Sequence, residues 1–171
     1  MCCNAIISID LNMKITILCV GKLKEKYFRD AIAEYSKRLS RYTTMEIIEV
    51  ADEKTSENAS EREIALVQEK EGKRILSHVK EQDLCIALAI KGKMYDSEGF
   101  SDAIAKYMEE GKSHITFIIG GSLGLSDEVL KRCRYSISFS HMTFPHQLMR
   151  VILLEQIYRG FRILNHEPYH K

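Results

Sequence analysis

The sequence predicts an α/β fold in which a mostly parallel sheet of five to six strands carries helices on both faces. Five short runs rich in Ile, Val and Leu alternate along the chain with segments of helical periodicity. This alternation is typical of parallel sheets, because each parallel connection needs a crossover, usually a helix. With 171 residues, 45% of them hydrophobic, and two prolines, the chain suits one core. We expect a single domain over residues 13–171, preceded by an extension over residues 1–12.

The first half of the chain contains two of these strands and two helices. Residues 13–20 form an apolar run closed by a glycine, and residues 45–50 form a second run. The segment between them repeats apolar residues at helical spacing. Ser60, with Glu63 three residues later, is a capping-box signature that begins a long charged helix extending to about Lys80.

The second half continues the same alternation. Strands are expected at residues 84–90, 114–119 and 135–140, and residues 91–93 are expected to form a turn. Helices are expected at residues 101–110, after Ser126, and from Pro145 to about Leu164. The last helix is apolar around most of its circumference, so it must be buried on all sides. A second copy of the chain would cover what one sheet face leaves open; the alternative is a central helix buried within one subunit.

Charge and cysteine content exclude several classes of protein. The chain carries 25 basic and 24 acidic residues, a formal charge of +1, so any contact with nucleic acid must come from a local patch. Its five cysteines show no C-x-x-C spacing, which argues against a disulfide framework or structural zinc and favours a reducing cytoplasm. Residues 5–20 are apolar but interrupted by Asp10, Asn12 and Lys14, so we expect neither a signal peptide nor a membrane span.

A ligand site is expected where the carboxyl ends of the strands meet, since loops and helix N-termini converge there. Three loops stand at such ends: residues 88–93, 120–124 and 139–144. The second holds three glycines in five positions, which allows close backbone approach to a ligand. It matches neither G-x-G-x-x-G nor G-x-x-x-x-G-K-[ST], so ordinary Rossmann and P-loop interpretations weaken. The alternative is a tight strand-to-helix turn with Ser126 as N-cap.

The C-terminal segment is locally basic. Residues 141–171 hold four Lys and Arg against two Glu, and four of the six histidines. The chain ends in Tyr169, His170 and Lys171, which combine a ring for base stacking, a titratable imidazole and a partner for phosphate. The alternative is an ordinary solvated tail.

Several short motifs between residue 13 and the C-terminus occur together in one family. These motifs are Met13-Lys14-Ile15-Thr16-Ile17, Ile118-Ile119-Gly120-Gly121-Ser122, Ser138-Phe139-Ser140, Met142-Thr143-Phe144-Pro145-His146-Gln147 and Tyr169-His170-Lys171. Through them, the chain resembles the SPOUT methyltransferases that act on RNA of the large ribosomal subunit.

The resemblance implies a C-terminal trefoil knot, an exception to the rule that chains avoid threading, and a homodimer. It implies methyl transfer from S-adenosylmethionine to N3 of a pseudouridine in helix 69 of 23S rRNA on the assembled ribosome, without a metal. The cofactor would be held by the knot loops, at the same three loops that the sheet argument selects. The residues expected to bind it are Leu88, Gly120, Phe139, Ser140, His141, Met142, Thr143 and Phe144.

Roles for individual side chains follow from the expected reaction. The protein must place N3 in line with an electrophilic methyl group and remove the N3 proton. His170 is the candidate base and Tyr169 the candidate contact to the target base; the alternative is that the tail only positions RNA and water takes the proton. Arg150, Arg159 and Lys171 are candidate RNA contacts, although the two arginines could also face the cofactor carboxylate or be solvated helix charges.

Other residues are given structural roles or depart from the family pattern. His146, just inside a helix N-terminus, is expected to be structural because the positive helix end disfavours its protonation. Cys85 and Cys133 are expected to fill the core. His141 stands at a variable family position, so only its backbone is expected to contact the cofactor, and the extension over residues 1–12 is not a family feature.

Three alternative functions remain open. A SPOUT methyltransferase acting on transfer RNA would keep both fold and chemistry. A noncatalytic ribosome-binding assembly factor would keep the fold alone, which the intact glycine-rich turn and Tyr-His-Lys end oppose. A flavodoxin-like nucleotide binder would need an early phosphate loop, for which residues 21–24, Gly-Lys-Leu-Lys, are a poor match.

Overall fold

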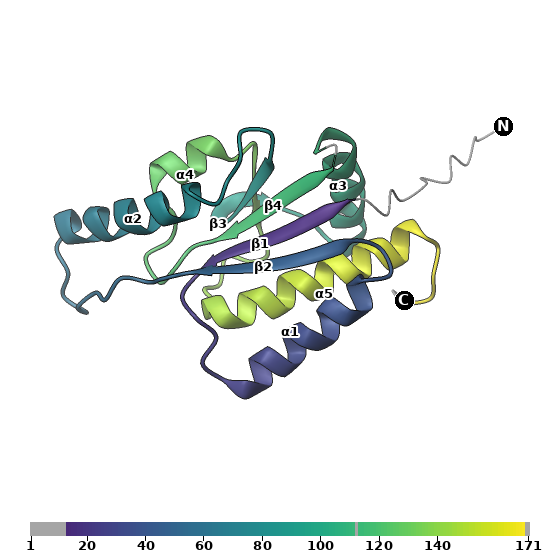
Figure 1. Cartoon of the computed structure of the whole chain (residues 1–171), viewed down its shortest axis with the longest axis horizontal. Helices are drawn as coiled ribbons and strands as arrows, with labels where there is room; N and C mark the ends of the chain where they lie inside the picture. Colours follow the sequence, from purple (N-terminus) through teal and green to yellow (C-terminus); the bar gives the residue numbers. More distant parts are fainter. Residues whose placement is uncertain (1–12, 112, 170–171) are drawn as a thin grey trace.

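The computed structural model describes residues 13–111 and 113–169, and these form a five-stranded parallel sheet in the order β2-β1-β4-β3-β5 (Figure 1). The predicted extension, Cys2 and Cys3, His170 and Lys171 lie outside the described residues. The elements are β1 (Lys14–Val20), α1 (Lys26–Leu39), β2 (Thr44–Val50), α2 (Glu61–Leu76), β3 (Leu84–Met94), α3 (Ser97–Glu110), β4 (His114–Ile119), α4 (Asp127–Arg132), β5 (Tyr135–Ser138) and α5 (His146–Leu164).

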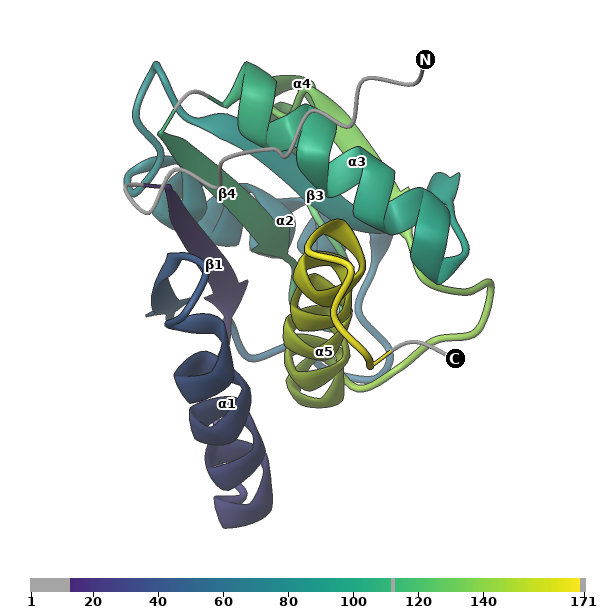
Figure 2. The ribbon, with the colours of Figure 1, turned by 90° about the vertical axis from the view of Figure 1, so that its right-hand side faces the viewer.

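Helices cover both faces of the sheet, as the sequence predicts. Helices α1, α3 and α5 lie on one face, and α2 and α4 lie on the other (Figures 1 and 2). The alternation along β1 matches these layers, because Ile17 packs into the core beneath α5 whereas Leu18 packs into the smaller core beneath α2. Burial on both faces explains why the central strands are almost wholly apolar.

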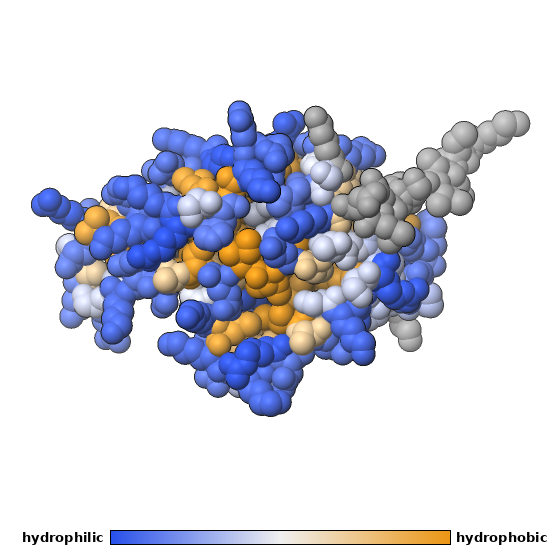
Figure 3. All heavy atoms as spheres, in the orientation of Figure 1, coloured by the Kyte–Doolittle hydropathy of each residue, from blue (hydrophilic) through white to orange (hydrophobic). Residues whose placement is uncertain are grey.

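The polar and apolar surfaces are clearly divided on the face shown in Figure 3. Polar side chains cover most of it, and apolar side chains form a band through its middle. Among the described residues, no helix combines the length and the apolar character needed to cross a membrane.

The predicted elements are confirmed, with shifts at four boundaries. Helix α2 begins at the predicted capping box, in which the Ser60 hydroxyl accepts from the Glu63 amide, but it ends at Leu76 instead of near Lys80. Helix α3 begins four residues earlier than predicted, because the carboxylate of its N-cap, Asp96, accepts a hydrogen bond from the Gly99 amide at 2.7 Å. The other two shifts concern β3 and β5.

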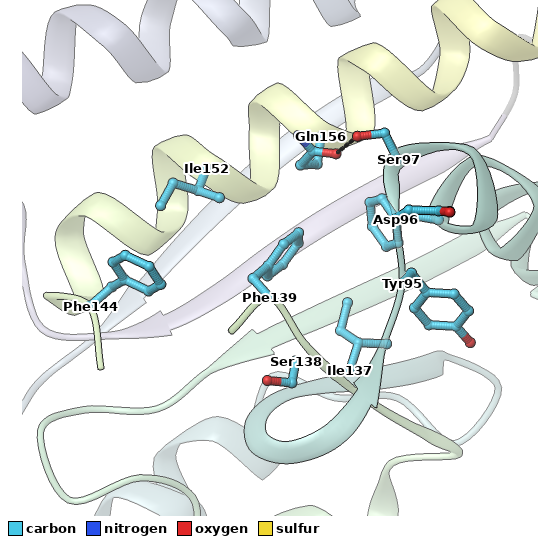
Figure 4. Close-up of a pocket in the computed structure, with 10 residues that line it drawn as sticks. Tyr95, Asp96, Ser97, Ile137, Ser138, Phe139, Phe144, Ile152 and Gln156 are labelled. Atoms are coloured by element: carbon cyan, nitrogen blue, oxygen red, sulfur yellow. Dashed lines mark hydrogen bonds between the residues drawn. The ribbon is translucent and has the colours of Figure 1, made fainter. Parts of the chain in front are cut away.

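Strand β3 does not end in a turn at residues 91–93; it bends there and continues. Ile137 of β5 is paired with Leu88 and again with Lys93, so residues 89–92 form an irregularity between the two pairings. Figure 4 shows the bend of β3 around Ile137 and Ser138. Strand β5 is correspondingly short and ends at Ser138. The trefoil knot stays a prediction.

Gly92 makes this bend possible. A Cβ atom at this position would lie 2.4 Å from the carbonyl carbon of Ile137 and 2.6 Å from its nitrogen. Both contacts are with backbone, which cannot rotate away as a side chain can. The two chain segments can therefore approach this closely only because residue 92 has no side chain.

Helix α5 is enclosed within one chain to a greater extent than its sequence suggested. It packs on the sheet between α1 and α3, and no residue of this fully described helix is exposed (Figure 2). Leu153, Leu154, Ile157 and Phe161 are completely buried. The central position that stood as the alternative accounts for most of the apolar surface of α5, and packing against a second copy stays a prediction.

Arg150 of α5 forms a buried ion pair with Glu49 and is not exposed for contact with RNA. Its side chain is 0% exposed, and it donates to the Glu49 carboxylate at 2.6 Å and to the carbonyl oxygens of Val20 and Gly21 at 2.9 and 2.7 Å. The predicted RNA-binding role of Arg150 is therefore corrected: its guanidinium joins α5 to the ends of β1 and β2. Charged residues are rarely buried unless paired in this way.

Replacing Arg150 with Met should lower the free energy of unfolding by about 3–5 kcal/mol, because Glu49 and two carbonyl groups lose their buried partner. The same change at Lys26, whose pair with Asp30 is exposed, should cost less than about 0.5 kcal/mol. Urea unfolding of both variants measures the difference. Equal losses would show that the Arg150 network does not stabilise the fold.

Replacing Gly92 with Ala should lower the free energy of unfolding by about 2–3 kcal/mol, since the added methyl group overlaps the Ile137 backbone. Gly124→Ala is the matched control: its Cβ would meet nothing within 4 Å, but its φ of +81° costs an alanine about 1 kcal/mol. In thermal unfolding, Gly92→Ala should have a lower Tm than Gly124→Ala. The reverse order would contradict the close approach of residue 92 to the Ile137 backbone.

Candidate functional site

The register of the sheet brings the three predicted loops together. Strand β3 lies between β4 and β5, and Leu88 is paired with Ile119 on one side and with Ile137 on the other. Gly120 directly follows Ile119, and Phe139 is two residues beyond Ile137. Because all these strands are parallel, the irregularity of β3 at residues 89–92, Gly120 and Phe139 lie at the same edge of the sheet, as expected for a ligand site of an open α/β sheet.

The glycine-rich segment at this edge is a tight turn. A Cβ on Gly120 would lie 2.8 Å from the carbonyl carbon of Gly124, and the Gly124 amide donates to the Gly121 carbonyl at 3.1 Å. Ser126 then caps α4 by accepting a hydrogen bond from the Val129 amide at 3.3 Å. The strand-to-helix turn that stood as the alternative interpretation is confirmed, so the glycines alone do not indicate a ligand.

Residues 139–144 form the loop between β5 and α5. The Ser138 hydroxyl donates to the Ser140 carbonyl, and the Ser140 hydroxyl accepts from the Met142 amide, each at 3.0 Å. His141, Met142 and Thr143 are exposed. Pro145 caps α5 without any side-chain hydrogen bond, so the loop leads to a positive helix end whose first amides lack a side-chain partner.

A cavity of about 290 Å³ lies against this loop (Figure 4). Phe139 and Phe144, two of the predicted cofactor residues, line it, whereas Leu88 and Gly120 are not among its lining residues. Phe139 packs edge-to-face on Phe100 with ring centroids 5.6 Å apart. The remaining lining residues are Tyr95, Asp96, Ser97, Ile137, Ser138, Ile152 and Gln156.

The cavity combines apolar walls with a polar rim, which is typical of small-molecule sites. Across it, the Ser97 hydroxyl donates to the Gln156 side-chain oxygen at 3.1 Å (Figure 4). Tyr95, Ser97 and Gln156 were not expected here from the sequence. A usable signal was present, because residues 95–97 follow directly on β3, but the expected turn at 91–93 placed the end of that strand too early.

The described part of the C-terminal tail packs back onto α5. The Tyr169 hydroxyl donates to a Glu155 oxygen at 3.2 Å, and the Arg159 guanidinium lies 4.7 Å from the centroid of the Tyr169 ring. Burial, followed by hydrogen bonding to Tyr35, raises the pKa of Tyr169 to about 12, so its hydroxyl stays protonated. Gln156 donates to the other Glu155 oxygen at 2.7 Å, which connects this cluster to the rim of the cavity.

His146 and the cysteines occupy positions in keeping with structural roles. The His146 ring is half-buried beside Gly21; a Cβ on that glycine would lie 3.2 Å from its Nε2. Burial and then the Arg150 guanidinium lower the pKa of His146, which favours neutral imidazole. Burial raises the pKa of Cys85 to about 11 and of Cys133 to about 12. The described residues contain no cluster of three or more side chains suited to a metal.

Solved structures share the fold at low sequence identity. A probable methylase family protein from Haemophilus influenzae Rd KW20 matches 94% of this chain and 70% of its own, with a TM-score of 0.52 and 14% identity. A probable methyltransferase from Bordetella pertussis Tohama I matches 88% of this chain and 95% of its own, with a TM-score of 0.52 and 11% identity. These likenesses support the fold alone.

Curated relatives match along their whole length. A protein named ribosomal RNA large subunit methyltransferase H from Clostridium novyi is 60% identical over 159 residues, which are 93% of this chain and 100% of the relative. A protein of the same name from Clostridium kluyveri is 59% identical with the same coverage. The family model described as predicted SPOUT methyltransferase matches residues 13–170. The chain therefore belongs to the SPOUT methyltransferase family.

Proposed function

We propose that this protein transfers a methyl group from S-adenosylmethionine to N3 of a pseudouridine in helix 69 of 23S rRNA. The observation that carries the proposal is the 60% identity to a large-subunit rRNA methyltransferase over that relative's entire length. The converging loops and the adjoining cavity support it, because they offer a place for a small cofactor at the edge of the sheet where ligands bind in open α/β folds.

The residues at this edge fit an adenosyl group. Phe100, Phe139 and Phe144 provide flat apolar surface for a base, and Ser97 and Gln156 provide partners for hydroxyl groups. Backbone groups at Leu88, Gly120 and residues 139–144 would hold the rest of the cofactor. When bound, S-adenosylmethionine supplies an electrophilic methyl group.

The residues of the protein must position the target base and remove its N3 proton. The apolar walls of the cavity exclude water from the reacting atoms. His170 would accept the proton from N3 of the base as the methyl group passes from the sulfonium sulfur to N3, which leaves a neutral thioether on the cofactor, and Tyr169 would contact the same base. The packing of Tyr169 against Arg159 and Glu155 supports a positioning role for the tail.

We assign the RNA contacts to Lys171 in the tail and to Arg159 in α5. The Arg159 guanidinium is paired with Glu155, and the Arg159 side chain is 24% exposed, so it can reach a phosphate only through its exposed part. Half-buried apolar residues of α5, such as Leu148 and Val151, would pack against a second copy in a homodimer. A ribosomal substrate places the protein in the cytoplasm.

Incubation with labelled S-adenosylmethionine and ribosomes that lack the modification should yield methylpseudouridine in 23S rRNA, detected by nucleoside mass spectrometry. Naked rRNA and bulk transfer RNA serve as parallel substrates. Label confined to transfer RNA would be compatible with a SPOUT methyltransferase but would refute 23S rRNA as the substrate. Cofactor binding without any transfer would favour a noncatalytic ribosome partner.

The variant His170→Ala serves as the matched control for chemistry in the same assay. It should bind the cofactor as the unchanged protein does and lose turnover, because the proton on N3 has no acceptor. Normal turnover by this variant would remove His170 from the mechanism and leave proton transfer to water.

A further inference from the structure

A second hollow, of about 380 Å³, adjoins the cavity at the loops. It is an open hollow between helix α3, the end of β3 and the start of β5. Tyr95 lines both hollows and so forms a shared wall between them. In Figure 4, Tyr95 lies at the end of the first cavity that is farther from Phe144. The residues that line the second hollow are Lys93, Tyr95, Gly99, Asp102, Ala103, Lys106, Tyr107 and Tyr135.

Three tyrosines give this hollow an aromatic lining. The rings of Tyr107 and Tyr135 lie with centroids 4.8 Å apart. Tyr107 is 1% exposed, so its side chain backs the hollow and does not reach solvent. Burial and then a side-chain hydrogen bond with Tyr95 raise the pKa of Tyr107, so the hydroxyl remains protonated. Tyr95 and Tyr135 are half-buried, and they present the aromatic surface that a ligand can reach.

Two lysines complete the hollow with positive charge. Lys93 Nζ lies 4.6 Å from the centroid of the Tyr95 ring, and Lys106 Nζ lies 5.4 Å from that of Tyr135. The stems of both lysines cover aromatic surface while the ammonium groups meet solvent. Lys93 forms no ion pair within the described part of the chain, whereas Lys106 has a long contact of 3.8 Å to Glu110.

The acidic groups nearby leave these ammonium groups available. Glu110 is engaged mainly by the Tyr135 hydroxyl at 2.7 Å and by Arg134 at 3.0 Å. Asp102 is the one carboxylate among the lining residues, set against two lysines. With a net charge of only +1 for the whole chain, a contact to phosphate needs such a local excess of cations.

We propose that this second hollow binds one nucleotide of RNA, with its base against the parts of the Tyr95 and Tyr135 rings that the lysine stems leave exposed and its phosphate beside Lys93 and Lys106. Aromatic rings with flanking cations are the usual means of holding a single-stranded nucleotide. The proposal deepens the proposed function, on which its choice of RNA rests. Because Tyr95 lines both hollows, the nucleotide lies beside the cavity that we propose for the cofactor.

A tryptophan reporter tests the stacking directly, because the chain contains no tryptophan. Tyr135→Trp should lose fluorescence as 23S rRNA or a single-stranded RNA oligonucleotide is added, since a stacked base quenches the indole. Tyr27→Trp, at a position on α1 that is 63% exposed, should keep its fluorescence. Emission from Tyr135→Trp that stays constant throughout both titrations would overturn the proposal.

A lysine pair tests the phosphate contact without altering the core. Lys93→Ala/Lys106→Ala should raise the Kd for RNA about tenfold and should flatten the slope of log Kd against log salt by about 0.7 for each phosphate that is no longer neutralised. Calorimetry should give an unchanged Kd for S-adenosylmethionine. Lys37→Ala/Lys131→Ala, which removes two lysines from α1 and α4 that are exposed, is the matched control. An equal Kd for RNA in the two double variants would contradict the proposed nucleotide site.

These measurements separate this proposal from the proposed function. If RNA binding depends on the two lysines but no methyl group is transferred to rRNA, the nucleotide site is supported and the proposed rRNA substrate is refuted. If methyl transfer to rRNA occurs and the KM for rRNA is the same for the lysine variant and the unchanged protein, the proposed function is supported and the nucleotide site is refuted.

Discussion

The close approach of Gly92 to Ile137 is the constraint on which the arrangement of the site depends. At this point β3 bends and pairs with β5 a second time, and only a residue without a side chain allows the two backbones to approach so closely. The bend carries residues 95–97 to the wall of the cavity. The same pairing fixes where Phe139 leaves the sheet. One glycine therefore determines how the end of β3 and the loop after β5 meet.

Electrostatics at the other end of the loop reinforce this geometry. Arg150 joins α5 to the ends of β1 and β2 by three hydrogen bonds, in a position with no exposure to solvent. This places the positive N-terminus of α5 behind residues 139–144. The burial and the positive charge that hold the helix also keep His146 neutral. The loop at residues 139–144 therefore lies between the close contact of Gly92 with Ile137 before it and the buried Arg150 ion pair after it.

Much of the fold could be predicted because apolar runs and capping signals are local. The ten elements and the coverage of both sheet faces follow from periodicity, and parallel pairing then brings together the loops that follow β3, β4 and β5. The continuation of β3 could not be predicted in this way, because Lys91-Gly92-Lys93 has the composition of an exposed turn. Its glycine is required by Ile137, a residue more than forty positions away.

The roles of charged residues were harder to predict, for a similar reason. A basic residue on a helix is solvated by default, and nothing near Arg150 in the sequence identifies Glu49 as its partner. The tyrosine-lined hollow was missed because Tyr95, Tyr107 and Tyr135 lie far apart in the sequence, on separate segments. Family resemblance added what local patterns could not, namely the chemistry expected at the loops.

Hydrogen exchange in the presence and absence of S-adenosylmethionine would show whether the three loops at the sheet edge hold one cofactor. We expect saturating cofactor to slow exchange together at the amides of residues 139–144, at Gly120 and around Leu88, while α2 is unchanged. Protection confined to one loop, or appearing away from this edge of the sheet, would contradict a shared site.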